Sequence, residues 1–201
     1  MPSSKCEERI KGLQLSGADL RRISLSEVNL QEAYLDEVKL SGARLTDVDF
    51  RGGHLNEGEL IEVDLRRAKM SGVDLRGAIL TRANLYMAEM EAADLRQAYL
   101  EGANLEGAKL VNADLRGAYL MDSIMQKACL RDANLNSANL DSADLSECDL
   151  SGADLENTIL SKAILMNAKV TAQQLETVKS LKKAIVPVRK EGLDSPDHEN
   201  S

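Results

Sequence analysis

Aspartate residues recur at a fixed interval in this sequence. Asp74, Asp94, Asp114 and Asp154 occupy the same place in a twenty-residue period. A row of carboxylates could bind an ion or another ligand. Short polar side chains also accept hydrogen bonds from backbone groups at turns, and we favour this structural role for the four aspartates.

Other residues that support catalysis are sparse. The chain has two histidines, His54 and His198, and three widely spaced cysteines, Cys6, Cys129 and Cys148. This spacing matches neither a zinc site nor a disulfide framework, and the glycines form no phosphate-binding loop. We therefore predict that the protein is not an enzyme and has no catalytic, cofactor-binding or metal-binding residues. Cys148 is predicted to be a small core residue, and Cys129 to point outward.

The elements that would position these side chains follow from a repeat of five residues. Leucine fills 27 of the 32 positions spaced by five between Leu15 and Val170, and alanine fills 20 of the 32 positions two residues earlier. Apolar residues recur every 3.6 residues in a helix and every 2 in a strand, so neither element explains the pattern. Internal repetition of this kind predicts a solenoid.

Each repeat is expected to form one short extended side followed by a turn. The alanine and leucine are two residues apart, so they point to the same side of an extended chain, and the polar or glycine-rich pair that follows suits a turn. Four repeats with corners near a right angle close a square coil. About eight such coils, stacked at roughly 4.8 Å, predict an all-β solenoid about 38 Å long.

The repeated units resemble the A-(D/N)-L-x-x signature of the pentapeptide repeat family. Examples are GADL, RANL, GANL, NADL, DANL and SADL, and the resemblance covers about residues 11–170. It implies a right-handed quadrilateral β-helix, and so adds a handedness to the square coil. It implies no chemistry.

The ends of the chain differ from the repeats. We expect an N-terminal cap over residues 1–12, the β-helix over 13–170, a C-terminal capping α-helix over 171–186 and a disordered tail over 187–201. The helix is predicted from a capping-box pattern and from apolar residues at helical spacing, and Pro187 would stop it. These residues are Thr171 with Gln174, and Leu175, Val178, Leu181 and Ile185.

A twenty-residue period brings distant positions into columns on the rod. One column holds arginines, and the column on the adjoining side holds apolar and aromatic residues. Arginine and tyrosine are enriched at the energetic centres of protein interfaces, so these columns form the candidate partner-binding surface. The alternative is that the arginines neutralise the aspartates and the tyrosines pack on each other. The six candidate residues are Arg76, Ile79, Arg96, Tyr99, Arg116 and Tyr119.

The charge of the chain restricts the class of partner. The formal net charge is −8, and seven acidic residues but no basic one lie between Arg131 and Lys162. Nucleic acids and anionic membranes repel carboxylates, so we expect another protein as the partner, with no direct binding to nucleic acid or membrane. Because the sequence shows neither a secretory signal nor a long apolar run, we expect a cytoplasmic location.

Two functions fit these observations. The first is a non-catalytic scaffold that binds another protein and regulates it. The second is a DNA-mimicking inhibitor or protector of DNA gyrase or topoisomerase, which the resemblance implies for one branch of the family. The acidic rod favours this second function, but that branch uses phenylalanine at the central position and this chain has Phe50 alone. Either a monomer or a homodimer is expected.

Overall fold

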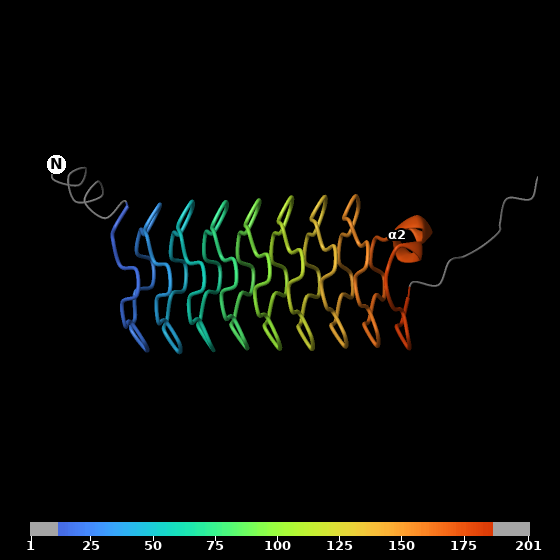
Figure 1. Ribbon diagram of the computed structural model, residues 1–201, viewed down its shortest axis with the longest axis horizontal. Coiled ribbons are helices and arrows are strands. Elements are labelled where there is room, and N and C mark those ends of the chain that lie inside the picture. Colours follow the sequence, from blue (N-terminus) through green and yellow to red (C-terminus); the bar gives the residue numbers. More distant parts are fainter. Residues whose placement is uncertain (1–11, 187–201) are drawn as a thin grey trace, which may run out of the picture.

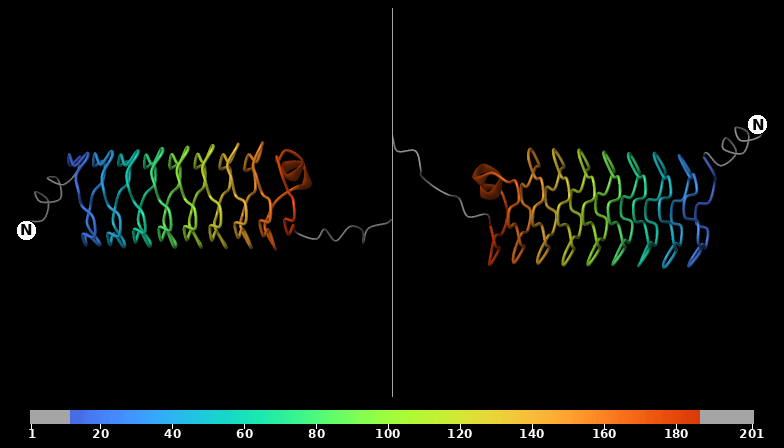
Figure 2. Two further views of the ribbon diagram at one scale, coloured as in Figure 1. Left: turned by 60° about the horizontal axis from the view of Figure 1, so that its bottom comes forward. Right: turned by 180° about the vertical axis from the view of Figure 1, so that it is seen from behind.

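The chain forms a straight rod of stacked coils (Figure 1). The computed structural model describes residues 12–186. The coils follow one another along the long axis, and views from other sides show the same stack, with helix α2 (Ala172–Glu176) at the C-terminal end (Figure 2). The predicted solenoid is confirmed. The predicted disordered tail and nearly all of the predicted N-terminal cap lie outside the described residues.

Each repeat contains one β-turn. In the repeat that begins at Leu95, the N–H of Ala98 donates to the carbonyl of Leu95 at 3.0 Å, and Gln97 has a φ of 57°. A positive φ at the third turn residue alone is typical of a type II turn. From residue 12 to residue 167 every such third residue has a φ of 54–73°; ten are glycine and none is valine, isoleucine or threonine. Branching at Cβ is disfavoured in this left-handed region, which explains the exclusion.

A repeat with aspartate or asparagine before its leucine satisfies all five of its backbone N–H groups. In the repeat Asp94–Ala98, the N–H groups of Asp94, Leu95 and Gln97 donate to carbonyls of the neighbouring coils, and that of Ala98 closes the turn. The remaining donor, the N–H of Arg96, bonds to Oδ1 of Asp94 at 3.2 Å. Buried or partly buried backbone groups need such partners, so an aspartate or asparagine at this position completes the repeat.

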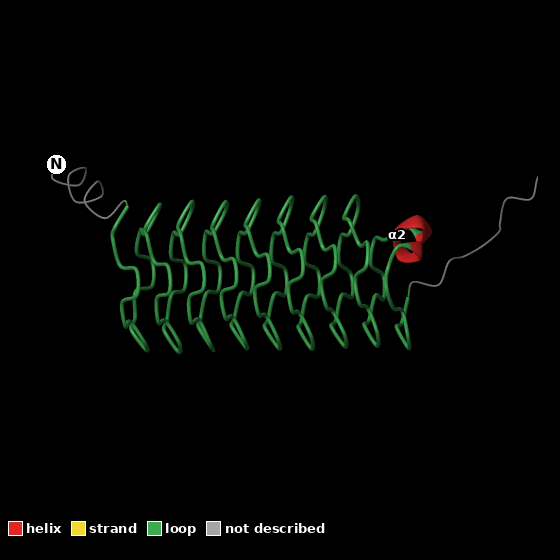
Figure 3. Cartoon of the chain, in the orientation of Figure 1, coloured by secondary structure: helices red, strands yellow, loops and turns green. Residues whose placement is uncertain are grey.

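The coils pair in parallel through one residue on each side. Residue n bridges residue n+20 without interruption from Gln14 and Tyr34 to Asp149 and Lys169. Because each side pairs through a single residue, the described coils are drawn as loops and turns, with α2 as the helix (Figure 3). Every outward column therefore has a spacing of roughly 4.8 Å along the axis.

The interior of the rod is filled by the leucine and alanine registers. Apolar residues in these registers between Leu30 and Leu165 are at most 4% exposed. The pairing of one large and one small side chain on each side leaves a narrow interior that these aliphatic groups fill at close packing. Inward residues of the first coil, such as Leu20 and Val28, are only partly buried.

The predicted capping helix over 171–186 is wrong in its length. The capping box of Thr171 and Gln174 is present, but α2 ends at Glu176, where the Thr177 hydroxyl and N–H both donate to the carbonyl of Gln174. The chain then returns to the ladder, with Ser180 bridging Ile159 and Ile185 bridging Ile164. These last bridges are shifted by a single position from the register of the regular coils.

The return to the ladder has a physical cause. The last coil presents unpaired backbone groups, and residues after α2 satisfy them: Leu160 donates to the carbonyl of Ser180 and Lys179 donates to that of Thr158, both at 2.8 Å. A helix there would leave this edge open. The segment LKKAIV, which starts at Leu181, also has the spacing of one more repeat, including a positive φ at Lys183.

Candidate partner-binding surface

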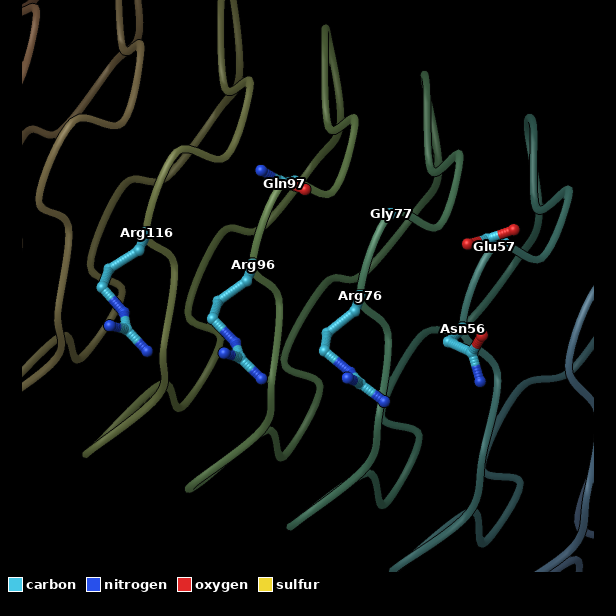
Figure 4. Close-up of a pocket in the computed structure, with 7 residues that line it drawn as sticks. All are labelled: Asn56, Glu57, Arg76, Gly77, Arg96, Gln97 and Arg116. Atoms are coloured by element: carbon cyan, nitrogen blue, oxygen red, sulfur yellow. The ribbon is translucent and has the colours of Figure 1, made fainter.

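Three arginines form a column along one corner of the rod. Their side chains extend in the same direction from successive coils, next to the small or polar residues that follow them in the chain (Figure 4). Together they border a shallow groove. Its lining residues are Asn56, Glu57, Arg76, Gly77, Arg96, Gln97 and Arg116.

Each of these arginines pairs with an aspartate two residues earlier. Nε and Nη2 of Arg76 donate to the carboxylate of Asp74 at 2.8 and 2.6 Å, and Nε lies 3.6 Å from Asp94 in the next coil. Arg96 repeats this arrangement, with bonds of 2.8 and 2.7 Å to Asp94 and a distance of 3.6 Å to Asp114. The result is a zigzag of alternating charges along the axis.

The electrostatics of this column follow from the pairing. The hydrogen bonds from Arg76 lower the pKa of Asp74, and the carboxylate in turn raises the pKa of Arg76. Partial burial raises the pKa of Asp114, but the bonds from Arg116 outweigh it and lower the pKa overall. Asp74 and Asp114 are thus held ionised by their arginine partners, and like Asp94 they act as structural groups of the turn.

The next column carries an aromatic stack. The rings of Tyr99 and Tyr119 lie 4.9 Å apart between centroids with an angle of 6° between their planes. Ile79 lies in the preceding coil and forms a backbone β-bridge with Tyr99. The tyrosines are 41% and 38% exposed, and neither hydroxyl has a hydrogen-bond partner in the part of the chain that the structure describes. Large exposed rings with free hydroxyls can make both apolar and polar contacts.

The six residues singled out from the sequence therefore occupy two neighbouring sides of one corner. The arginines turn toward the aspartates of the preceding side, and the tyrosines lie on the following side. Gly77, Gln97 and Gly117 stand between the two columns on successive coils. The stacking of each column agrees with the period of twenty, and its role as a binding surface stays a prediction.

The contacts of the alternative prediction are present, because the arginines neutralise the aspartates and Tyr99 packs on Tyr119. One arrangement was missed from the sequence. It is another aromatic stack, on the side of the rod that carries the aspartates: Tyr34 and His54 lie 4.8 Å apart and nearly parallel. Tyr34 is 41% exposed, like Tyr99, so it offers a matched comparison.

The remaining reactive groups add no second site. Cys148 is buried, its Sγ donates to the carbonyl of Met125, and burial raises its pKa to about 12, so its prediction as a core residue is confirmed. Cys129 is half-buried on an outward position. Among residues 12–186, no group of three or more potential metal ligands converges. The helix in this range is also too short to traverse a lipid bilayer.

The acidic end of the rod is partly neutralised from the following coil. Lys162 lies 3.1 Å from Asp141, and Lys169 lies 3.1 Å from Asp149. The other acids of this end are distributed around the rod, as the period of twenty predicts, and so form no double row.

Comparison with known proteins identifies the class. A family model described as pentapeptide repeats matches eight copies, over residues 14–52, 59–97, 98–136 and 133–171. The chain therefore belongs to the pentapeptide repeat family and forms its right-handed quadrilateral β-helix. No curated protein sequence matches the chain at a significant level.

Solved structures with similar folds come from the same family. HetL, a pentapeptide repeat protein involved in heterocyst differentiation regulation from the cyanobacterium Nostoc sp. strain PCC 7120, shares 31% identity over 87% of this chain and 81% of its own, with a TM-score of 0.33. QnrB1, a plasmid-mediated fluoroquinolone resistance protein, shares 18% identity over 89% and 91% of the chains, with a TM-score of 0.49. A second Nostoc protein of the family shares 29% identity over 50% and 82%, with a TM-score of 0.45.

Proposed function

We propose that this protein is a non-catalytic regulatory scaffold that binds another protein through the surface around Arg76, Arg96, Arg116, Tyr99 and Tyr119. The observation that carries the proposal is the exposed stack of Tyr99 on Tyr119 beside the arginine groove. Stacked tyrosines present a rigid apolar surface whose ordering costs little entropy, which suits a binding site. The regulatory part of the proposal is supported by the 31% identity to HetL.

The proposal is tested by comparing two aromatic stacks whose tyrosines are similarly exposed. Affinity capture from a lysate of the source organism uses the wild type, the double variant Tyr99→Ser/Tyr119→Ser and the control Tyr34→Ser. A crosslinkable residue, p-benzoylphenylalanine, is placed at position 119 or at position 34 in parallel. We expect a partner that crosslinks from position 119 and is lost with the double variant alone. Equal capture by all three proteins would contradict the proposal, provided that circular dichroism shows each is folded.

The net charge of −8 favours a second candidate, a DNA-mimicking inhibitor or protector of DNA gyrase. Such mimicry needs rows of unpaired carboxylates at phosphate-like positions. Asp74, Asp94 and Asp114 form a row, but each is bound by an arginine fork. We therefore expect no effect of micromolar protein on DNA supercoiling by gyrase. Inhibition, or protection of gyrase from a fluoroquinolone, would replace the scaffold proposal by this one.

A further inference from the structure

One strip of the surface has no charged side chain over five successive coils. It consists of two adjacent columns, here called the neutral strip. In a chain with 29% charged residues this length of uncharged surface is unusual. The strip contains Gly77, Gln97, Gly117, Ser137 and Asn157 in one column, and Ile79, Tyr99, Tyr119, Asn139 and Ile159 in the other.

The composition of the neutral strip is that of a binding surface. Tyrosine, serine, glycine and asparagine predominate in antibody paratopes, where rings provide contact area and small polar groups adapt to the partner. Here Tyr119 stands beside Gly117 and Tyr99 beside Gln97, and Ile79 and Ile159 lie at the two ends. A partner would therefore meet continuous apolar contacts from Ile79 to Tyr119, then the polar Asn139 before Ile159.

The partner cannot dock here by adding a β-strand. The backbone groups of this side are already used in the axial ladder: the N–H of Tyr119 donates to Ala98 at 2.9 Å, and its carbonyl accepts from Leu100 at 2.7 Å. An element that binds through side chains alone must satisfy its own backbone hydrogen bonds, and an α-helix does so.

The dimensions of the strip match a helix along the axis. From Ile79 to Ile159 the column crosses four intervals between coils, or about 19 Å at roughly 4.8 Å each. A helix of about 13 residues has this length, and its pitch of about 5.4 Å is close enough to the roughly 4.8 Å between coils for successive turns to face successive coils over three coils. Aliphatic residues at spacings of three and four would thus meet Ile79, Tyr99 and Tyr119 in turn.

The charges beside the strip indicate which charges a bound helix should carry along its sides. On the corner that follows the strip, Arg82 pairs with Glu62 and Lys162 with Asp141, which leaves Glu101 and Asp122 without a cationic partner among the described residues. On the opposite corner Arg76, Arg96 and Arg116 are each neutralised by an aspartate, and Glu156 lies at the C-terminal end of the strip. Beside Tyr99 and Tyr119 one flank is therefore acidic and the other is neutral, which favours basic residues on one side of the bound helix.

We propose that the neutral strip binds an amphipathic α-helix of a partner protein, with its apolar stripe on Tyr99 and Tyr119 and with lysine or arginine residues over Glu101 and Asp122. This inference rests on the proposed function and names the element that the partner contributes. A second copy of the chain supplies no such element from its described residues, because the one helix within residues 12–186 has five residues.

The probe is a synthetic Leu–Lys peptide of about 14 residues with amphipathic helical patterning. Its binding to the full-length protein is followed by fluorescence anisotropy, and its helix content by circular dichroism. Compared with the wild type, we expect Tyr99→Ser/Tyr119→Ser to weaken binding by at least about tenfold and Glu101→Gln/Asp122→Asn by about threefold to tenfold. The matched variant Tyr34→Ser should bind within about twofold of the wild type, and a scrambled peptide of the same composition should bind poorly.

Four results would overturn the inference: equal binding of a Leu–Glu peptide, equal loss with Tyr34→Ser, no binding of the Leu–Lys peptide, or a dimer in sedimentation that the double tyrosine variant abolishes. The proposed function fails separately. If p-benzoylphenylalanine at position 119 crosslinks a partner through a segment that is not helical, the scaffold proposal stands and the helix inference is wrong. If it crosslinks a helical segment with a basic flank, both are supported.

Discussion

The side-chain amide of Gln174 donates a hydrogen bond to the backbone carbonyl of Ala153 at 2.9 Å. In the regular coils this position is filled by a backbone N–H, as where Asp94 donates to Val73 at 2.9 Å. The same amide donates to the carbonyl of Leu150 at 2.8 Å. One side chain of α2 thereby substitutes for a strand that the last coil lacks.

Replacement of this glutamine is expected to loosen the C-terminal end. Gln174→Ala removes both carbonyl contacts and the capping box, so we expect a loss of about 1–3 kcal/mol in the local free energy of opening. Faster amide exchange at Asn157 and Thr158 is the readout. Gln173→Ala, an exposed neighbour in α2, is the control and should leave exchange unchanged. Equal protection in the two variants would show that the amide contributes nothing.

Replacement by glycine at two adjacent alanines should change the free energy of unfolding in opposite directions. Ala92 is exposed with a φ of 54°, and Ala93 is 1% exposed in the core. Ala92→Gly relieves a left-handed conformation and should stabilise the protein by about 0.5–1 kcal/mol. Ala93→Gly removes a buried methyl group and should destabilise by about 1 kcal/mol or more. Urea unfolding measures both, and destabilisation by Ala92→Gly would contradict the strain argument.

The inward hydroxyls of Ser123 and Thr158 provide a second contrast. Both residues are buried at positions where alanine is usual, but Thr158 donates to the carbonyl of Leu135 at 2.8 Å while the Ser123 hydroxyl has no partner among the described residues. We expect Ser123→Ala to raise the free energy of unfolding by about 1 kcal/mol and Thr158→Ala to lower it. Thermal unfolding of the two variants checks the order. Destabilisation in both would imply that Ser123 has a bound water as its partner.

The paired carboxylates predict a decline in stability in acid. Partial burial raises the pKa of Asp49, but hydrogen bonds from Arg51 and Gln31 outweigh it and bring the pKa to about 2. A lowered pKa in the folded state contributes stability above the unfolded value of about 3.9, and this contribution is lost as the pH falls toward 2. Asp49→Asn should therefore lose less stability than the wild type between pH 5 and 2.5, by on the order of 1 kcal/mol after screening. Asp122→Asn, at an exposed carboxylate, is the control for net charge.

Most of the fold could be predicted because each repeat has the same environment. Leu95 and Ala98 face the core because they occupy the same positions in their repeat as Leu75 and Ala78. The assignment of inward residues in one repeat therefore applies to the others. The C-terminal end failed because Leu175, Val178 and Leu181 have helical spacing although the edge beyond Ile159 needs backbone partners. Local spacing carries no information about that edge.

For the candidate site, the sequence predicts which residues stack in a column but not the directions of their side chains. The period of twenty places Tyr99 beside Tyr119, but the direction of the Arg96 side chain depends on the turn that brings Asp94 next to it. That geometry includes a positive φ at Gln97, which the residue type does not indicate. The neutral strip is a property of two adjacent columns together, which the twenty-residue period places side by side.

The uniform core makes the arrangement of the outer surface sensitive to small changes in length. Deleting any single repeat between Gly77 and Asn157 would preserve the alternation of buried leucine and alanine, yet it would rotate the rest of the rod by one side and divide the neutral strip between two faces. Inserting a complete coil of four repeats would instead keep all columns aligned, and it would lengthen the strip by one coil if its residues in the two columns were uncharged. Stability and partner recognition can therefore change independently in this architecture. Folding depends on the five-residue repeat, whereas the alignment of surface residues depends on the twenty-residue coil.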